Sequence, residues 1–293
     1  MDNEGSVGYS AATPPQPDIN PLPSAFALWK RAWAIFRKRT ATLVGIAAFS
    51  VPPMIVVYAL TATNKWYWVM LATIIMVLGE TMMMMAYIVA LDGGAAIGAN
   101  EAYRRVSGKL PRAIWLMFIS FVVVFGAMGL LIIPGILFAG WFMFALYVLV
   151  LENQGGMNAL FYSREYVRGK WWAAVGYMLL PAFICAALTV ILNALFSALR
   201  LPYAADVVNI AVSLTVMPVA AVYMYLVYAG LKARKGPVAV KISAGRKTKY
   251  LATGAIGLIL LIVFLVGSIL IMLGLTKGGL TSADQSAVPA LNR

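Results

Sequence analysis

Long apolar runs divide the chain into seven segments, and shorter polar connections separate them. The runs cover residues 41–61, 66–91, 113–133, 135–151, 172–199, 203–231 and 251–275. A helix needs about 20 mostly apolar residues to cross a hydrocarbon core of roughly 30 Å. The short alternating segments typical of a membrane β-barrel are absent. The pattern therefore predicts an all-α polytopic transmembrane bundle with about seven spans.

The third and fourth runs are the hardest to separate, because only Ile133, Pro134 and Gly135 lie between them. A Pro-Gly step favours a tight turn. Together, residues 113–151 would form a helix of about 58 Å at about 1.5 Å per residue, far longer than one crossing needs. Two crossings are predicted here, and a bent re-entrant hairpin is the alternative.

Composition supports the same class of protein. Hydrophobic residues make up 62% of the 293 residues, charged residues make up only 11%, and the mean hydropathy is +0.87. These values lie outside the range of soluble globular domains and indicate an integral membrane protein. The single cysteine, Cys185, lies in the fifth run and is interpreted as a packing residue, since one thiol cannot form an internal disulfide.

The 23 Lys and Arg residues are distributed unevenly between alternate connections. The segments before the first, third, fifth and seventh runs contain five, four, three and seven of them. The other side has only Lys65, Arg200, Lys277 and Arg293. By the positive-inside rule, the N-terminus is predicted to be cytoplasmic and the C-terminus outside, in the plasma (inner) membrane of a bacterium.

The net charge of +13 needs no nucleic-acid partner, because membrane orientation accounts for most of it. Cytoplasmic lipid headgroups are anionic and attract basic residues next to spans. The predicted partners are therefore membrane lipids, especially anionic headgroups on the cytoplasmic side, with a membrane protein as a further possibility.

Five regions are predicted along the chain. Residues 1–24 are rich in Pro and small polar residues, lack the features of a secretory signal, and are expected to be a disordered cytoplasmic tail. Residues 25–231 form a six-span membrane domain, 232–250 a basic cytoplasmic loop, and 251–275 the seventh span. Residues 276–293 are expected to be an unstructured tail.

Three cytoplasmic segments, 27–39, 101–109 and 159–170, mix aromatic with basic residues. At helical spacing Trp29 and Trp33 share one face, which favours an amphipathic helix in the membrane interface. Each segment precedes a pair of spans, which suggests three units of interfacial helix plus hairpin, followed by the seventh span. The alternative is that these are ordinary juxtamembrane stretches. The candidate lipid contacts are Trp29, Trp33, Arg104, Arg105, Arg164, Arg168, Lys170 and Trp171.

The middle of the chain carries a recognisable series of motifs. Ile133-Pro-Gly-Ile precedes an aromatic span, and Leu-Glu-Asn-Gln-Gly-Gly (151–156), Ala-Leu-Phe-Tyr-Ser (159–163) and Val-Arg-Gly-Lys-Trp-Trp (167–172) follow. Over roughly residues 26–231 the chain resembles the glycerophosphoryl diester phosphodiesterase membrane domain family. The resemblance implies about six helices and says little about mechanism, because the family name comes from a catalytic domain that this chain lacks.

Catalytic chemistry has little support in the sequence. The chain has no His and only ten acidic residues, and it contains no phosphate-binding Gly-Lys-Ser or Gly-Lys-Thr loop. Either Glu152 or Glu165 is expected to bond Arg164 or Arg168 and to hold the third interfacial helix against the bundle. We predict a non-enzymatic protein with no catalytic residues, no cofactor and no metal site.

Glu80 is the exception to the apolar character of the spans, since it lies near the middle of the second run. A carboxyl group at that depth is costly and is a candidate proton or cation site; otherwise it is a protonated packing residue. Asn193, Asn209 and Ser213 are its candidate polar partners. Broken helices provide polar backbone in many transporters, and Pro residues at 52, 53, 181 and 218 interrupt three runs.

Two functional hypotheses follow from these features. The first is a membrane protein that supports membrane or envelope organisation through lipid or protein contacts at its cytoplasmic face. The second is a small transporter or channel-like protein that uses the carboxylate of Glu80.

Overall fold

The computed structural model describes residues 23–285, apart from 62, 64, 95–96, 200–203, 237, 239 and 241–242. The side chains of residues 58, 204–207, 209, 244 and 271–285 are outside this description. Over the described ranges the chain is all-α, without strands. The residues of the predicted N-terminal tail up to 22, and those from 286 onward, lie outside the described residues.

Seven helices or helix pairs in the described part of the chain are long and apolar enough to cross a membrane. This confirms the predicted all-α bundle with seven spans and makes the chain an integral membrane protein. In order, the spans are α2 (Thr40–Ala48) with α3 (Val51–Thr61), α4 (Trp66–Asp92), α6 (Leu110–Leu130), α7 (Ile132–Phe142) with α8 (Ala145–Glu152), α10 (Trp171–Ala198), α11 (Ala204–Lys235) and α12 (Ala244–Gln285).

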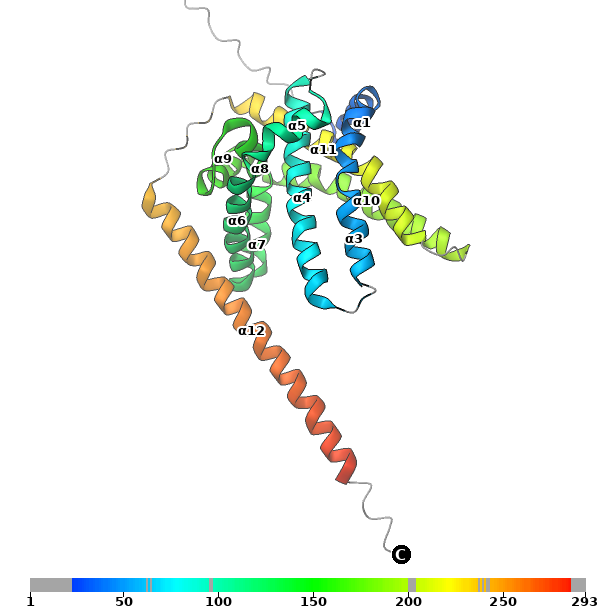
Figure 1. Cartoon of the computed structure of the whole chain (residues 1–293). Helices are drawn as coiled ribbons and strands as arrows, with labels where there is room; N and C mark the ends of the chain where they lie inside the picture. The colour runs from blue at the N-terminus through cyan, green and yellow to red at the C-terminus, as the bar shows by residue number, and fades with distance from the viewer. Residues whose placement is uncertain are drawn as a thin grey trace, which may run out of the picture.

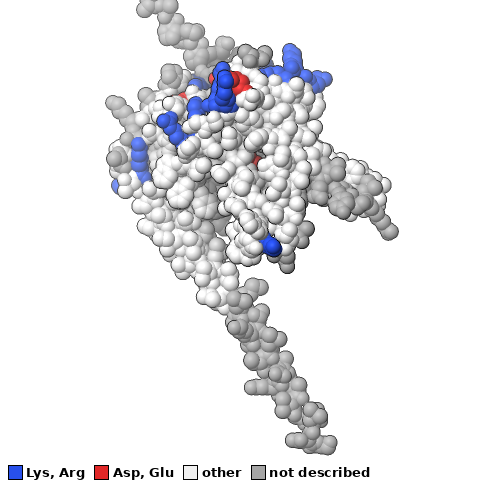
Figure 2. Space-filling model, viewed as in Figure 1, with Lys and Arg blue, Asp and Glu red and all other residues white. Residues whose placement is uncertain are grey.

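Three short helices precede successive pairs of spans: α1 (Ala25–Lys38), α5 (Ala99–Ser107) and α9 (Met157–Val167). All three lie at the same end of the bundle (Figure 1). Lys and Arg side chains gather at that end in the space-filling view (Figure 2), and we call it the basic end. The element order therefore has the predicted arrangement of short helix plus hairpin, three times over.

The turn between the third and fourth spans lies earlier than the sequence predicted. Leu131 alone is extended, with φ −158° and ψ 138°, and α7 starts at the next residue. Pro134 lies in the first turn of α7, where a backbone N–H has no helical partner, so the missing donor of proline costs nothing. Two crossings are present, but the Pro-Gly step begins a helix instead of turning the chain.

Two spans are broken, and only one of the breaks is caused by proline. Between α2 and α3 the helix stops just before Pro52 and Pro53, which cannot donate to the carbonyls one turn earlier. The hydroxyl of Tyr103 donates to the Ile46 carbonyl beside this break, at 2.9 Å. Pro181 and Pro218 lie inside continuous helices, so these two prolines do not interrupt their spans.

The break between α7 and α8 contains no proline and is bonded by a side chain from α9. Met143 and Phe144 leave the helix, and Ser163 of α9 bonds both sides of the gap. Its Oγ accepts a hydrogen bond from the Phe144 backbone N–H at 3.1 Å and donates to the Trp141 carbonyl at 2.7 Å. Ser163 is completely buried. The short helix α9 is therefore part of the core as well as of the basic end.

The seventh span contacts the rest of the bundle mainly through α6, and its far end extends beyond the other helices (Figure 1). Gly126 and Gly129 of α6 face Gly254 and Gly257 of α12. A Cβ atom on Gly254 would lie only 2.9 Å from the Val122 carbonyl oxygen. Small residues let two membrane helices approach at backbone distance, where van der Waals contact replaces the missing hydrophobic driving force.

Two predicted boundaries differ from the structure. The basic loop expected at 232–250 is shorter, because α11 continues to Lys235 and α12 starts at Ala244. Likewise α12 continues to Gln285, so residues 276–285 are helical and not unstructured. Lys232, Arg234 and Lys235 are good helix formers, so α11 continues past the end of its apolar run. The extension of α12 includes Gly278 and Gly279, so helix propensity does not explain it.

Candidate functional site

Basic side chains at the basic end bind the ends of neighbouring helices. The Arg39 guanidinium donates to the carbonyl of Ala90 in the last turn of α4, at 2.8 Å. Lys109 reaches the carbonyl of Val150 near the end of α8, at 2.7 Å. Lys235 donates to two carbonyls at the end of α9. The last carbonyls of a helix lack partners and carry partial negative charge, so these cations stabilise three helix ends.

Glu152, at the end of α8, is the centre of a polar cluster. Its carboxylate accepts hydrogen bonds from the hydroxyls of Tyr166 and Tyr228, each at 2.7 Å, and lies 3.1 Å from the Lys232 ammonium. Burial, followed by the hydrogen bond to this carboxylate, raises the pKa of Tyr166. A carboxylate with three donors is well satisfied, so the cluster ties α8, α9 and α11 together.

Of the two candidate acids, Glu152 bonds neither Arg164 nor Arg168; its partners are the two tyrosines and Lys232. Glu165 does pair with Arg168, at 3.6 Å, and 73% of the Arg168 side chain is exposed. Sequence spacing could place residues within one helix but could not show that Lys232 of α11 reaches α8.

Arg164 is held more firmly than an exposed lipid-contact residue would be. Its guanidinium donates to the Tyr250 hydroxyl at 2.9 Å and lies 4.5 Å from the centre of the Trp141 ring. Around it, a cavity of about 450 Å³ opens between α9 and the start of α12. The cavity is lined by Phe161, Arg164, Glu165, Arg168, Val240, Arg246 and Tyr250.

Trp29 and Trp33 lie on α1, above a groove of about 780 Å³ between α1 and the helices α10 and α11. Leu28, Ala32 and Phe36 bury one face of α1 in the bundle, while Trp33 is 42% exposed. Residues Trp29, Lys30, Trp33, Arg37, Ile184, Leu188, Thr215, Val216 and Val219 line the groove. Basic and aromatic groups from α1 therefore meet aliphatic side chains from the spans.

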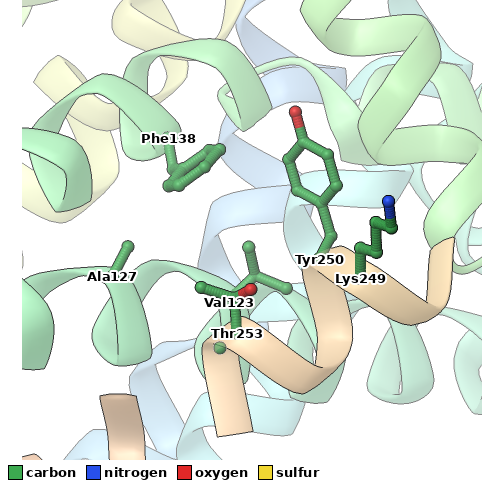
Figure 3. Close-up of a pocket in the computed structure, with 7 residues that line it drawn as sticks. Val123, Ala127, Phe138, Lys249, Tyr250 and Thr253 are labelled. Atoms are coloured by element: carbon green, nitrogen blue, oxygen red, sulfur yellow. The ribbon is translucent and has the colours of Figure 1, made fainter. Parts of the chain in front are cut away.

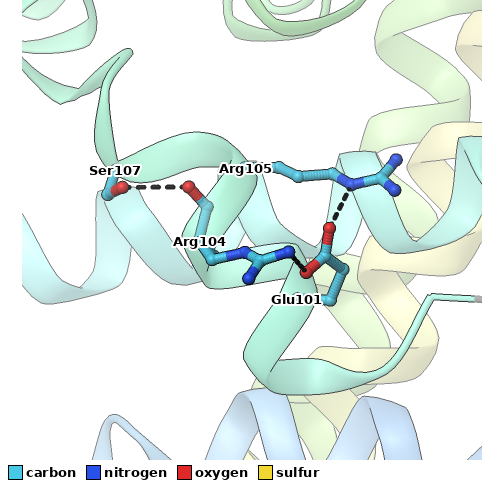
Figure 4. A network of polar contacts seen from close by, with 4 residues as sticks. All are labelled: Glu101, Arg104, Arg105 and Ser107. Carbon is cyan, nitrogen blue, oxygen red and sulfur yellow. Dashed lines mark hydrogen bonds and ion pairs between the residues drawn. The ribbon is translucent and has the colours of Figure 1, made fainter.

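Arg104 and Arg105 pair with the same carboxylate on α5, that of Glu101 (Figure 4). The distances are 2.6 and 2.8 Å. The hydrogen bond from Arg105, helped by the charges of both arginines, lowers the pKa of Glu101. Both guanidinium groups are largely exposed, where such pairs contribute little to stability, so they remain available to a charged surface.

Lys170 and Trp171 mark the start of α10. Lys170 is exposed and precedes the first turn, while the Trp171 indole N–H donates to the Leu137 carbonyl at 3.2 Å. The neighbouring Trp172 is 81% exposed and was not among the predicted contacts. A tryptophan at a span end is typical of the interfacial aromatic belt, which could have identified it.

Glu80 lies in the middle of α4, between two cavities. One, of about 770 Å³, is formed with α3, α10 and α11, and the other, of about 430 Å³, is formed with α6 and the break between α7 and α8. Ser213 lines the larger cavity with Glu80. Asn193 instead donates to the Thr189 carbonyl of its own helix, and the side chain of Asn209 lies outside the described residues.

The chain matches no protein-family model, no curated protein and no solved structure. The resemblance to the glycerophosphoryl diester phosphodiesterase membrane domain family thus stays a prediction from its motifs. Across the described residues, no group of three or more His, Cys, Asp or Glu side chains is placed to hold a metal ion.

Proposed function

We propose that this protein is a non-enzymatic inner-membrane protein that organises the membrane by contacting anionic lipids with its basic, cytoplasmic end. The observation that carries the proposal is the groove beneath α1. Lys30 and Arg37 supply positive charge, Trp29 and Trp33 supply rings suited to the interface, and the floor is aliphatic. The lining thus combines cationic, aromatic and aliphatic groups, which suit a lipid headgroup, the interface and an acyl chain.

The distribution of charge supports the same proposal. Several cations are used to hold helix ends, but Arg104, Arg105 and Arg168 are mostly exposed at the basic end. Each Lys or Arg near an anionic leaflet contributes about 1 kcal/mol of attraction. The absence of His from the sequence supports the non-enzymatic part.

The test uses full-length protein in nanodiscs containing mixed zwitterionic and anionic lipids. The double variant Trp33→Ala, Arg37→Gln should reduce the enrichment of anionic lipid around the protein about fivefold, which corresponds to about 1 kcal/mol for the lost charge. Native mass spectrometry of co-released lipids measures the enrichment.

The matched control is Lys65→Gln, Trp66→Ala, which removes the same kinds of groups from the N-terminal end of α4. Trp66 is 70% exposed, so the control should fold and keep wild-type enrichment. Equal losses in both double variants, or none in either, would contradict the proposal.

Glu80 favours a second candidate function, transport of a proton or small cation. Glu80 is exposed and lines cavities on both sides of α4, and one of these cavities borders the break between α7 and α8. A carboxyl group at mid-span beside broken helices has the features of a transporter site.

Proteoliposomes loaded with a pH-sensitive dye test this candidate. Glu80→Gln should abolish a wild-type proton flux, whereas Ser213→Ala, in the same cavity, should alter it less. Unchanged flux in Glu80→Gln protein would leave Glu80 as a packing residue.

A further inference from the structure

We propose that one anionic phospholipid binds in a specific site between α9 and α12, with its phosphate beside Arg164 and Arg246 and an acyl chain beside Phe138. The inference rests on the proposed function, because it assigns lipid contact at the basic end to a defined place. Two adjoining cavities with a shared wall form this site.

The polar cavity provides the charge for a phosphate. Arg164, Arg168 and Arg246 contribute three positive charges and Glu165 one negative charge, so its lining has a net formal charge of +2. Arg164 is oriented by the Tyr250 hydroxyl and the Trp141 ring. A fixed guanidinium fork suits phosphate oxygens better than a freely moving cation does.

The apolar cavity lies next to it and has a volume of about 180 Å³. Its walls come from α6, α7 and α12, and its lining consists of Val123, Ala127, Phe138, Lys249, Tyr250, Thr253 and Gly254. In Figure 3 the Tyr250 hydroxyl and the Lys249 ammonium point the same way, away from Val123 and Ala127. The Tyr250 hydroxyl and the Lys249 ammonium thus lie away from Val123 and Ala127, while the Thr253 hydroxyl lies beside Val123.

Tyr250 is the shared wall of the two cavities. Its ring contacts Phe138 and Phe161 edge to face, with centroids 5.6 and 5.2 Å apart, while its hydroxyl accepts from Arg164. A ligand that used both cavities would need an anionic group and a hydrocarbon chain separated by about one tyrosine ring. An anionic phospholipid has both, whereas a free phosphate would use only the polar cavity.

The experiment measures binding of dioctanoyl phosphatidylglycerol to the detergent-purified full chain by native mass spectrometry. Dioctanoyl phosphatidylcholine provides the same chains without net charge, and inorganic phosphate provides the charge without chains. Phosphatidylglycerol should bind most tightly. Arg246→Gln should weaken it about fivefold, because one charge is lost near the phosphate.

Two further variants distinguish binding in this site from attraction to the overall positive charge of the protein. Lys65→Gln removes one positive charge from the N-terminal end of α4, outside both cavities, and should leave binding unchanged. Thr253→Phe should fill the apolar cavity and weaken phosphatidylglycerol binding without changing that of phosphate. Circular dichroism and gel filtration check that each variant is folded.

Equal effects of Arg246→Gln and Lys65→Gln would overturn the site. So would phosphatidylcholine or inorganic phosphate binding as tightly as phosphatidylglycerol. If the site fails while Trp33→Ala, Arg37→Gln still loses anionic-lipid enrichment in nanodiscs, the proposed function stands without it. If that enrichment is absent but phosphatidylglycerol still binds here, the proposed function is wrong and the site remains.

Discussion

Ser163 has a role that its residue type does not reveal. A serine in a membrane helix usually bonds a carbonyl of its own helix, as Ser120 does with Leu116 at 2.7 Å. Ser163 instead bonds a backbone N–H and a backbone carbonyl that the break between α7 and α8 leaves without helical partners in the core. An unpaired backbone group in such a place costs about 1–3 kcal/mol.

Ser163→Ala should therefore lower the free energy of unfolding by about 1–3 kcal/mol. Denaturant titration of the purified protein in mixed micelles measures the change. Ser120→Ala is the control and should change stability by less than about 0.5 kcal/mol, because the Leu116 carbonyl keeps its helical partner. Equal losses in the two variants would show that Ser163 does not stabilise the break.

The sequence motifs singled out Ser163 and Arg164 but did not show what these residues contact. Ser163 lay in the motif 159–163, and Arg164 was a predicted lipid contact, because aromatic and basic residues were recognisable beside the spans. The bonds of Ser163 to α7 and of Arg164 to Tyr250 join distant parts of the chain. No periodicity within a helix encodes such a contact, so the cavity beside α12 could not be predicted.

At the scale of the helices, α12 depends on its glycines. Any side chain on Gly257 would overlap the carbonyl of Gly126, so the two backbones would have to separate. Gly267, on the same helix, has no atom outside its own helix within 4 Å of a Cβ position. Both residues are glycines of the same helix, but Gly257 lies against the α6 backbone and Gly267 lies against no other helix.

Gly257→Val should move α12 away from α6, whereas Gly267→Val should not. Spin labels replace the exposed residues Phe121 and Ile259 in a Cys185→Ala background. The distance between the two labels is measured by pulsed electron paramagnetic resonance. The Gly257 variant should show a longer and broader distance distribution. An unchanged distribution would mean that α12 is held by contacts other than its close approach to α6.

The ends of the helices could be predicted where the sequence of the helix itself determines them. The prediction failed where contacts with other helices determine them. The seven apolar runs matched the seven spans, because run length alone determines whether a helix can cross. The break at Met143 and Phe144 contains no proline and exists beside a serine from another helix. Pro134, which does suggest a turn, is tolerated in the first turn of α7.

For the whole molecule, the distribution of basic residues predicts a cytoplasmic N-terminus and an outside C-terminus. Fusions of reporters that work on only one side of the membrane should report opposite locations for the two ends. A chain truncated after Lys235 should bring the C-terminal reporter to the same side as the N-terminal one, because six spans remain. A cytoplasmic signal from the full-length C-terminus would contradict the seven-crossing topology.

The contacts of Arg39, Lys109 and Lys235 with helix ends link orientation to stability. Each of these residues belongs to the charge asymmetry from which the positive-inside rule predicts the orientation, and each also binds the end of a helix. Substitutions that neutralised them in order to reverse the membrane orientation would also destabilise the helix bundle. A substitution at any one of the three therefore changes a charge that contributes to the predicted orientation and removes a hydrogen bond at a helix end.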